Sequence, residues 1–146
     1  MTYLLDTNIV SEFRKLRPHG AVTAWRRSIP IHQLAIPAVV LAEAQAGAEI
    51  TRKQNPVKEA ELESWIDSLM DYYTVLPADG AIFREWARLM RGVSADQSAD
   101  AMIAATARVL ELIVATRNVR DFLRFKVRVV NPFEYSPGSA TEGTRR

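Results

Sequence analysis

Five short apolar segments, separated by longer segments of helical periodicity, constrain the fold of this chain more than any other feature of its sequence. The apolar segments are residues 2–5, 33–36, 73–76, 112–115 and 127–130. Each is mostly apolar on both sides of the strand alternation, as in strands covered on both faces. Between them, apolar residues recur every three or four positions, as on one face of a helix. Strands that alternate with helices predict an α/β fold whose parallel sheet carries helices on both faces.

The length and the residue types limit both the number of domains and the available chemistry. A chain of 146 residues is of single-domain size. We expect one domain over residues 1–135 and a flexible tail over 136–146, where Ser, Gly, Thr and Pro predominate. There is no cysteine, and the two histidines, His19 and His32, lie near prolines in predicted turns. Thiolate chemistry is excluded, and a catalytic centre has to be built from carboxylates and other oxygen ligands.

Charge and hydropathy exclude few partners. The formal net charge is +2 and the sequence pI is about 9.1, which permits a nucleic-acid partner without requiring one. No apolar run approaches the roughly 20 residues of a membrane span, and the first ten residues lack the basic head of a signal peptide. We therefore expect a cytoplasmic protein with no membrane association.

Acidic and small polar residues follow the first predicted strand, where a ligand of such a sheet would bind. Asp6 is followed by Thr7 and Asn8, and any of the three can cap the next helix. Capping alone therefore explains Asp6, but three capping groups exceed what one helix needs. Glu43 lies in an apolar predicted helix, where a buried lone carboxylate is costly unless paired, protonated or bound to a cation. The alternative is that Glu43 occupies a narrow solvent-facing stripe.

Further acids accompany the fourth predicted strand and the helix before it. Asp100 begins a run of small apolar residues, where an acid also suits the helix dipole. Asp96, four residues earlier, either caps that helix or lies on the same face as Asp100. Asp121 stands three residues after Asn118, at capping-box spacing.

Together these acids predict a metal site. The ends of the first and fourth strands meet at one edge of a doubly wound sheet, and carboxylates gathered there raise one another's pKa unless cations lie between them. Hard divalent ions such as Mg²⁺ or Mn²⁺ accept oxygen ligands of this kind. A pair of such ions can activate water for phosphodiester hydrolysis.

Four successive motifs resemble those of PIN-domain ribonucleases, in particular VapC-type toxins of bacterial toxin–antitoxin pairs and their FitB-like branch. The motifs are Leu5-Asp6-Thr7-Asn8, Val40-Leu41-Ala42-Glu43, the run from Asp100 to Ala107, and Val114-Ala115-Thr116-Arg117-Asn118 with Asp121-Phe122. They occur in order and the resemblance covers residues 2–133. It implies a PIN-like three-layer α/β/α sandwich with a central parallel five-stranded sheet and Mg²⁺- or Mn²⁺-dependent cleavage of RNA.

The resemblance also implies residue roles and partners. The metal-binding and catalytic acids would be Asp6, Glu43, Asp100 and Asp121, with Asn8 and Thr116 in support. A VapB-like antitoxin would cover the acidic pocket, and the protein would form a homodimer. Arg14 and Arg117 are the basic residues expected nearest the site, as candidate RNA contacts. Two alternatives stay open: a PIN-like binding or regulatory module without turnover, and a housekeeping RNA-processing PIN nuclease.

Overall fold

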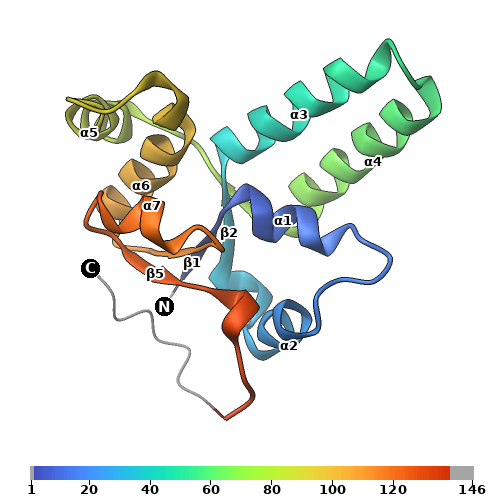
Figure 1. The fold of residues 1–146 in the computed structure, drawn as a ribbon, viewed down its shortest axis with the longest axis horizontal. Helices are drawn as coiled ribbons and strands as arrows, with labels where there is room; N and C mark the ends of the chain where they lie inside the picture. Colours follow the sequence, from blue (N-terminus) through green and yellow to red (C-terminus); the bar gives the residue numbers. More distant parts are fainter. Residues whose placement is uncertain (1, 139–146) are drawn as a thin grey trace.

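The five predicted strands form one sheet in which every pairing is parallel (Figure 1). The computed structural model describes residues 2–138, so most of the expected tail, 136–146, lies outside the described residues. The strands are β1 Tyr3–Leu5, β2 Leu34–Pro37, β3 Thr74–Leu76, β4 Ile113–Ala115 and β5 Arg128–Val130, and their order in the sheet is β3-β2-β1-β4-β5. Each begins and ends within one residue of its prediction.

Helices cover both faces of this sheet. They are α1 Thr7–Phe13, α2 Gly20–Ser28, α3 Ala38–Arg52, α4 Pro56–Tyr72, α5 Gly80–Leu89, α6 Ser98–Leu110 and α7 Val119–Leu123, with short 3₁₀ turns η1 Ile31–Gln33, η2 Ala95–Gln97 and η3 Pro132–Glu134. Right-handed crossovers place α1 to α4 on one face and α5 to α7 on the other. The expected three-layer α/β/α architecture is confirmed.

The point where the strand order reverses lies at the centre of the sheet. Tyr3 of β1 pairs with Leu34 of β2 on one side and with Ile113 of β4 on the other. The chain thus continues from β1 to β2 and β3 on one side of β1, and later places β4 and β5 on the other side of β1. The crevice at the carboxyl ends of β1 and β4 is the usual ligand position in open α/β sheets.

The core lies along the two central strands and the helices against them. Leu4, Leu5, Ile36, Ile103 and Val114 are completely buried, and burying an aliphatic side chain of this size contributes roughly 1.5–3 kcal/mol. The edge strands are less enclosed, since Thr74 of β3 is exposed. The expectation that all five strands are covered on both faces therefore fails at the sheet edge.

The first helix is shorter than its periodicity predicts. The spacing of Ile9, Phe13 and Leu16 predicts a helix through Leu16, but α1 ends at Phe13 and the Leu16 side chain is fully exposed. One contact and one steric restriction favour this ending: the Glu12 carboxylate accepts a hydrogen bond from the His19 backbone N–H at 2.8 Å, and Pro18 disfavours helical geometry in the residue before it. The segment between α1 and α2 is thereby turned away from the helix axis.

The third helix is also more exposed than its composition predicts. In α3 only Val40 and Ala48 are buried, and Glu43 is exposed. The reason is that α3 packs against α4, and the two helices extend together from the body of the molecule as a two-helix arm (Figure 1). Glu43 therefore has no desolvation cost. This agrees with the alternative interpretation of the sequence, in which Glu43 faces solvent.

Candidate functional site

Asp6 stands at the carboxyl end of β1 with both carboxylate oxygens engaged. Its Oδ1 accepts the Thr7 backbone N–H at 2.7 Å, which also caps α1. Its Oδ2 accepts the Thr116 hydroxyl at 2.7 Å and the Asn8 amide at 3.1 Å. Asp6 is only 4% exposed. Burial raises its pKa above the usual value, with a smaller rise from Glu43, while these hydrogen bonds oppose the rise.

Thr116 and Asn8 tie the ends of β4 and β1 together. The buried Thr116 hydroxyl accepts the Asn118 backbone N–H at 2.9 Å while it donates to Asp6. The Asn8 side chain donates to Asp6 and accepts the Arg117 backbone N–H at 3.1 Å. Each polar side chain thus has partners from both strand ends, which fixes the Asp6 carboxylate in one orientation.

Glu43 reaches the same region from the two-helix arm. Its Oε1 accepts the Thr7 hydroxyl at 2.6 Å. Thr7 follows Asp6 directly, so the start of α3 and the start of α1 present carboxylates to one place. A solvent-exposed carboxylate beside a buried one can receive a cation without a prior cost of desolvation.

Asp100, in the first turn of α6, is electrostatically coupled to the other three acids. Its pKa is raised to about 6, mainly by burial and also by repulsion from Asp6, Asp121 and Glu43, while Arg124 opposes the rise. Like charges have this effect only when they lie close to the group. The structure therefore brings the four predicted acids into one electrostatic site, which we call the acidic site.

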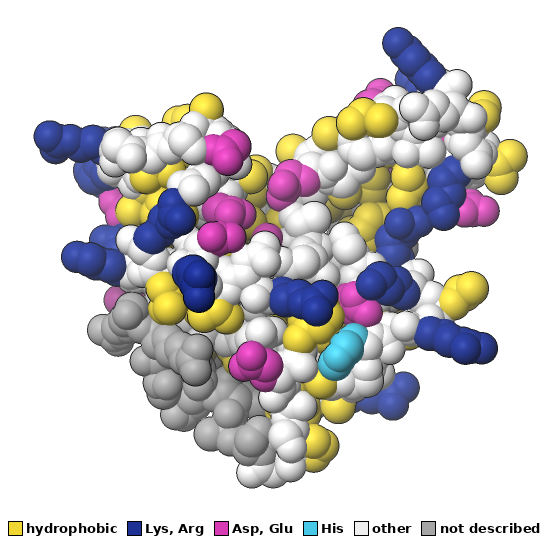
Figure 2. Space-filling view, in the orientation of Figure 1, with side chains coloured by type: hydrophobic (Ala, Val, Ile, Leu, Met, Phe, Trp, Pro, Cys, Tyr) yellow, Lys and Arg dark blue, Asp and Glu magenta, His cyan; other side chains and the backbone are white. Residues whose placement is uncertain are grey.

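The acidic site opens on a hollow of the molecular surface. Figure 2 shows acidic side chains gathered in the hollow between the two-helix arm and the side formed by α5 and α6, with Lys and Arg side chains further out. Burial and the neighbouring acids raise the pKa values of Asp6 and Asp100 in this site, and hard divalent cations supply the positive charge that offsets this effect. The donor set of the acidic site thus fits a Mg²⁺ or Mn²⁺ ion.

Other acids lie apart from this arrangement. Asp96 is exposed in η2, where its carboxylate accepts the Ser94 hydroxyl, and the acids that most raise the pKa of Asp100 are Asp6, Asp121 and Glu43. Within residues 2–138, the acids spaced most tightly for a shared ion are Glu49, Glu59 and Glu63 on the two-helix arm, with carboxylate oxygens within 4.8 Å of one another. Sequence reasoning did not single them out, because they share no motif and meet only when α3 packs on α4.

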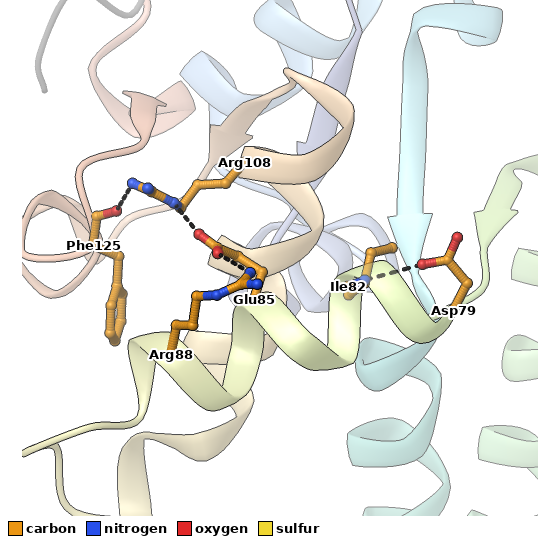
Figure 3. Close-up of polar contacts among 6 residues, drawn as sticks. All are labelled: Asp79, Ile82, Glu85, Arg88, Arg108 and Phe125. Carbon is orange, nitrogen blue, oxygen red and sulfur yellow. Dashed lines mark hydrogen bonds and ion pairs between the residues drawn. The ribbon is translucent and has the colours of Figure 1, made fainter.

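Figure 3 shows two interactions of α5: a cap at its own start, and an ion pair with α6, the helix that carries Asp100. The Asp79 carboxylate caps α5 by accepting the Ile82 backbone N–H at 3.0 Å, as its position predicts. Glu85 of α5 accepts the Arg108 Nε–H of α6 at 2.6 Å, and Arg108 also donates to the Phe125 carbonyl at 3.0 Å. The far end of α6 is thus tied both to α5 and to the chain after α7.

The two candidate RNA contacts have different surroundings. The Arg14 guanidinium lies over the Trp65 ring of α4, 5.4 Å from its centroid. The Arg117 guanidinium lies over the Phe133 ring at 4.5 Å, and its backbone is held by Asn8 of the acidic site. Arg117 is therefore the one directly connected to the acidic site.

Sequence comparison finds a PIN domain over residues 3–127. The chain is 31% identical over 139 residues to Toxin FitB of Neisseria gonorrhoeae, which covers 89% of this chain and 97% of that protein. It is 33% identical over 137 residues to VapC ribonuclease Y4jK of Sinorhizobium fredii, with 90% and 97% covered.

The structural comparison agrees with the sequence comparison. The crystal structure of FitAcB from Neisseria gonorrhoeae is similar with a TM-score of 0.78 at 30% identity, covering 91% of this chain and 99% of that one. The structure of FitAB bound to an IR36 DNA fragment is similar with a TM-score of 0.80 at 28% identity, covering 94% and 100%. Separately, none of the helices in the described residues combines the length and hydropathy that crossing a membrane requires.

Proposed function

Because this chain belongs to the PIN-domain family, we propose that it is the toxin of a type II toxin–antitoxin pair and acts as a metal-dependent endoribonuclease. The observation that carries the proposal is the acidic site at the switch point of the sheet, where Asp6, Asp121 and Glu43 act electrostatically on Asp100. The similarity to Toxin FitB and to VapC ribonuclease Y4jK over nearly the whole chain supports it.

The four acids are proposed to hold Mg²⁺ or Mn²⁺, while Asn8 and Thr116 support Asp6. A divalent ion at such a site supplies positive charge that lowers the pKa of water and offsets charge on the phosphate. Thr7, Asn8 and Thr116 restrict Asp6 to one rotamer, because their hydrogen bonds engage both of its oxygens. Burial and repulsion from the other three acids raise the pKa of Asp100 to about 6, and a divalent ion held by the site would offset that repulsion.

The proposed partners are an RNA substrate, a VapB-like antitoxin and a second copy of the chain, in the cytoplasm. The solved relatives FitAcB and FitAB are complexes, one of them on DNA. A basic antitoxin segment is the expected ligand of the acidic site, because it would neutralise the four carboxylates. Co-purification of the natively expressed protein with mass spectrometry identifies the antitoxin, and light scattering of the toxin alone gives its oligomeric state.

The test of the activity is the substitution Asp6→Asn. It keeps the size of the side chain but removes the charge, so RNA cleavage in Mg²⁺ or Mn²⁺ should fall by at least about 100-fold, and growth arrest on expression should be lost. Asp96→Asn is the matched control, since Asp96 is an exposed acid outside the acidic site, and it should cleave like the wild type. Cleavage by Asp6→Asn at the wild-type rate, or cleavage that survives chelation of divalent ions, contradicts the proposal.

A further inference from the structure

Three side chains from distant parts of the chain form a stack beside the acidic site. The Arg117 guanidinium, after β4, lies over the face of Phe133, in η3, at 4.5 Å. The ring of His19, which caps α2, lies against Phe133 with centroids 5.0 Å apart and planes tilted by 55°. We call Arg117, Phe133 and His19 the aromatic stack.

The backbone N–H of each member of the aromatic stack donates a hydrogen bond to a side chain. The Arg117 backbone N–H is held by Asn8, which also holds Asp6. The His19 backbone N–H donates to the buried Glu12, and the His19 Nδ1 accepts the Ala21 backbone N–H at 3.2 Å. The Phe133 backbone N–H donates to the Asn131 side chain at 3.0 Å. A surface that is ordered before binding loses less conformational entropy when a ligand arrives.

The polar edges of the stack are available to a ligand. Arg117 and His19 are both exposed, and within the described residues no carboxylate forms an ion pair with Arg117. A guanidinium carries its N–H groups in one plane, which suits paired hydrogen bonds to a phosphate. Because Nδ1 of His19 is occupied as an acceptor, the neutral ring carries its proton on Nε2.

We propose that the aromatic stack binds the RNA strand next to the phosphodiester that is cut, with Arg117 on a flanking phosphate and the His19 edge on the neighbouring nucleotide. This inference rests on the proposed function and extends it to residues outside the acidic site. Single-stranded nucleic acids are bound by cations that follow the backbone and by planar side chains on which bases stack. Figure 2 shows histidine, hydrophobic and basic side chains together on the same face as the acidic hollow, as a continuous strand would require.

The experiment compares steady-state cleavage of one single-stranded RNA by the full-length wild type and by Arg117→Ala. Loss of the phosphate contact should raise KM about tenfold and leave kcat within about twofold. It should also reduce the slope of log affinity against log salt by about 0.7, the value for one phosphate of a single strand. Arg52→Ala is the matched control, because it removes one exposed charge at the end of the two-helix arm, and its KM and salt slope should equal the wild-type values.

Two milder variants separate contact from folding. Arg117→Lys keeps the charge and should restore the salt slope, but only part of the affinity, since an ammonium does not stack as a guanidinium does. His19→Asn keeps a side chain that can cap α2 but has no ring, and should raise KM about threefold. All variants should unfold at the wild-type temperature.

The outcomes distinguish this inference from the proposed function. If the wild type cleaves RNA and Arg117→Ala changes KM no more than Arg52→Ala does, the aromatic stack does not bind RNA. A fall in kcat alone also overturns the inference, because Arg117 would then act only through Asn8. If the wild type cleaves no RNA, the proposed function fails, and fluorescence anisotropy of the same labelled RNA with the same variants still decides whether the stack binds it.

Discussion

Thr116 is the residue on which the orientation of Asp6 most depends. Its side chain is completely buried and bonds to Asp6, Asn118 and Asn8, at 2.7, 2.9 and 3.4 Å. A buried carboxylate that loses a donor of this kind keeps its desolvation cost and loses part of what offsets it. The hydroxyl is therefore expected to matter for both stability and activity.

We predict that Thr116→Val lowers the free energy of unfolding by about 1–3 kcal/mol and RNA cleavage by about 10- to 100-fold. The Thr116 hydrogen bond lowers the pKa of Asp6, so its loss raises that pKa further and moves the acid limb of the pH–activity profile to higher pH. Urea denaturation and a pH series of cleavage rates measure the two effects. Thr116→Ser, which keeps the hydroxyl, should behave like the wild type; an equal loss in both variants would assign the effect to packing.

Residue-level prediction from the sequence succeeded where a motif sets the local geometry. Asp6 and Thr116 directly follow adjacent strands, so their meeting could be expected from topology alone. The exposure of Glu43 could not be expected, because the small apolar residues around it are typical of a buried helix. Only the packing of α3 on α4 leaves that face open.

At the scale of elements, α5 and α6 behave as one unit joined by Glu85 and Arg108 (Figure 3). The Glu85 side chain is 14% exposed and that of Arg108 37%. Arg108, followed by Arg88, lowers the pKa of Glu85 below its usual value. Because Asp100 lies in the first turn of α6, the position of that helix affects the acidic site as well as the core.

We predict that Glu85→Gln lowers the free energy of unfolding by about 1 kcal/mol at pH 7, because Arg108 loses its charged partner. A group whose pKa is lowered in the folded state stabilises it above the unfolded pKa and ceases to do so as pH falls through the folded pKa. The difference between wild type and Glu85→Gln should therefore shrink as pH falls below the ordinary glutamate pKa and vanish below the lowered pKa of the folded state. Arg88→Gln, at a side chain that is 60% exposed, should change stability by less than about 0.5 kcal/mol.

The element pattern was the most predictable part of the fold. Strands of three or four residues separated by helical periodicity left little alternative to a parallel sheet, and all five were found. The end of α1 was not predictable from periodicity, because Leu16 continues the apolar spacing past Phe13. The Glu12 carboxylate accepts the His19 backbone N–H just beyond the end of α1. These two residues meet only once the chain has turned there, so the sequence alone does not predict this hydrogen bond.

At the scale of the whole molecule, charge is unevenly distributed. The net charge of +2 hides a surplus of six cations outside the four acids of the acidic site. Before a cation binds, two of those acids, Asp6 and Asp100, oppose folding. Burial and mutual repulsion raise the pKa of Asp100 to about 6 and also raise that of Asp6, so the folded chain holds these protons more tightly than the unfolded chain does.

We predict that Asp100→Asn stabilises the metal-free protein. With its pKa raised from 3.8 to about 6, the wild-type carboxyl costs nothing below pH 4 and its full penalty above pH 6, so the advantage of the variant should grow across that range to the order of 1 kcal/mol. Urea denaturation with chelator at pH 4 and 7.5 measures it. Mg²⁺ or Mn²⁺ should stabilise the wild type at pH 7.5 more than the variant; equal stabilisation of both would mean that Asp100 holds no ion.

The bond between Thr116 and Asp6 spans 110 positions of the chain, and this separation has a consequence for synthesis. Chains are made from the amino end, so Asp6 and Glu43 exist long before their partners on α6, β4 and α7. A ribosome-bound fragment that ends before residue 113 lacks β4, and the sheet cannot close around its switch point. A protein that cuts RNA would thus be harmless while it is being translated, and would acquire its activity only after nearly the whole chain has been made.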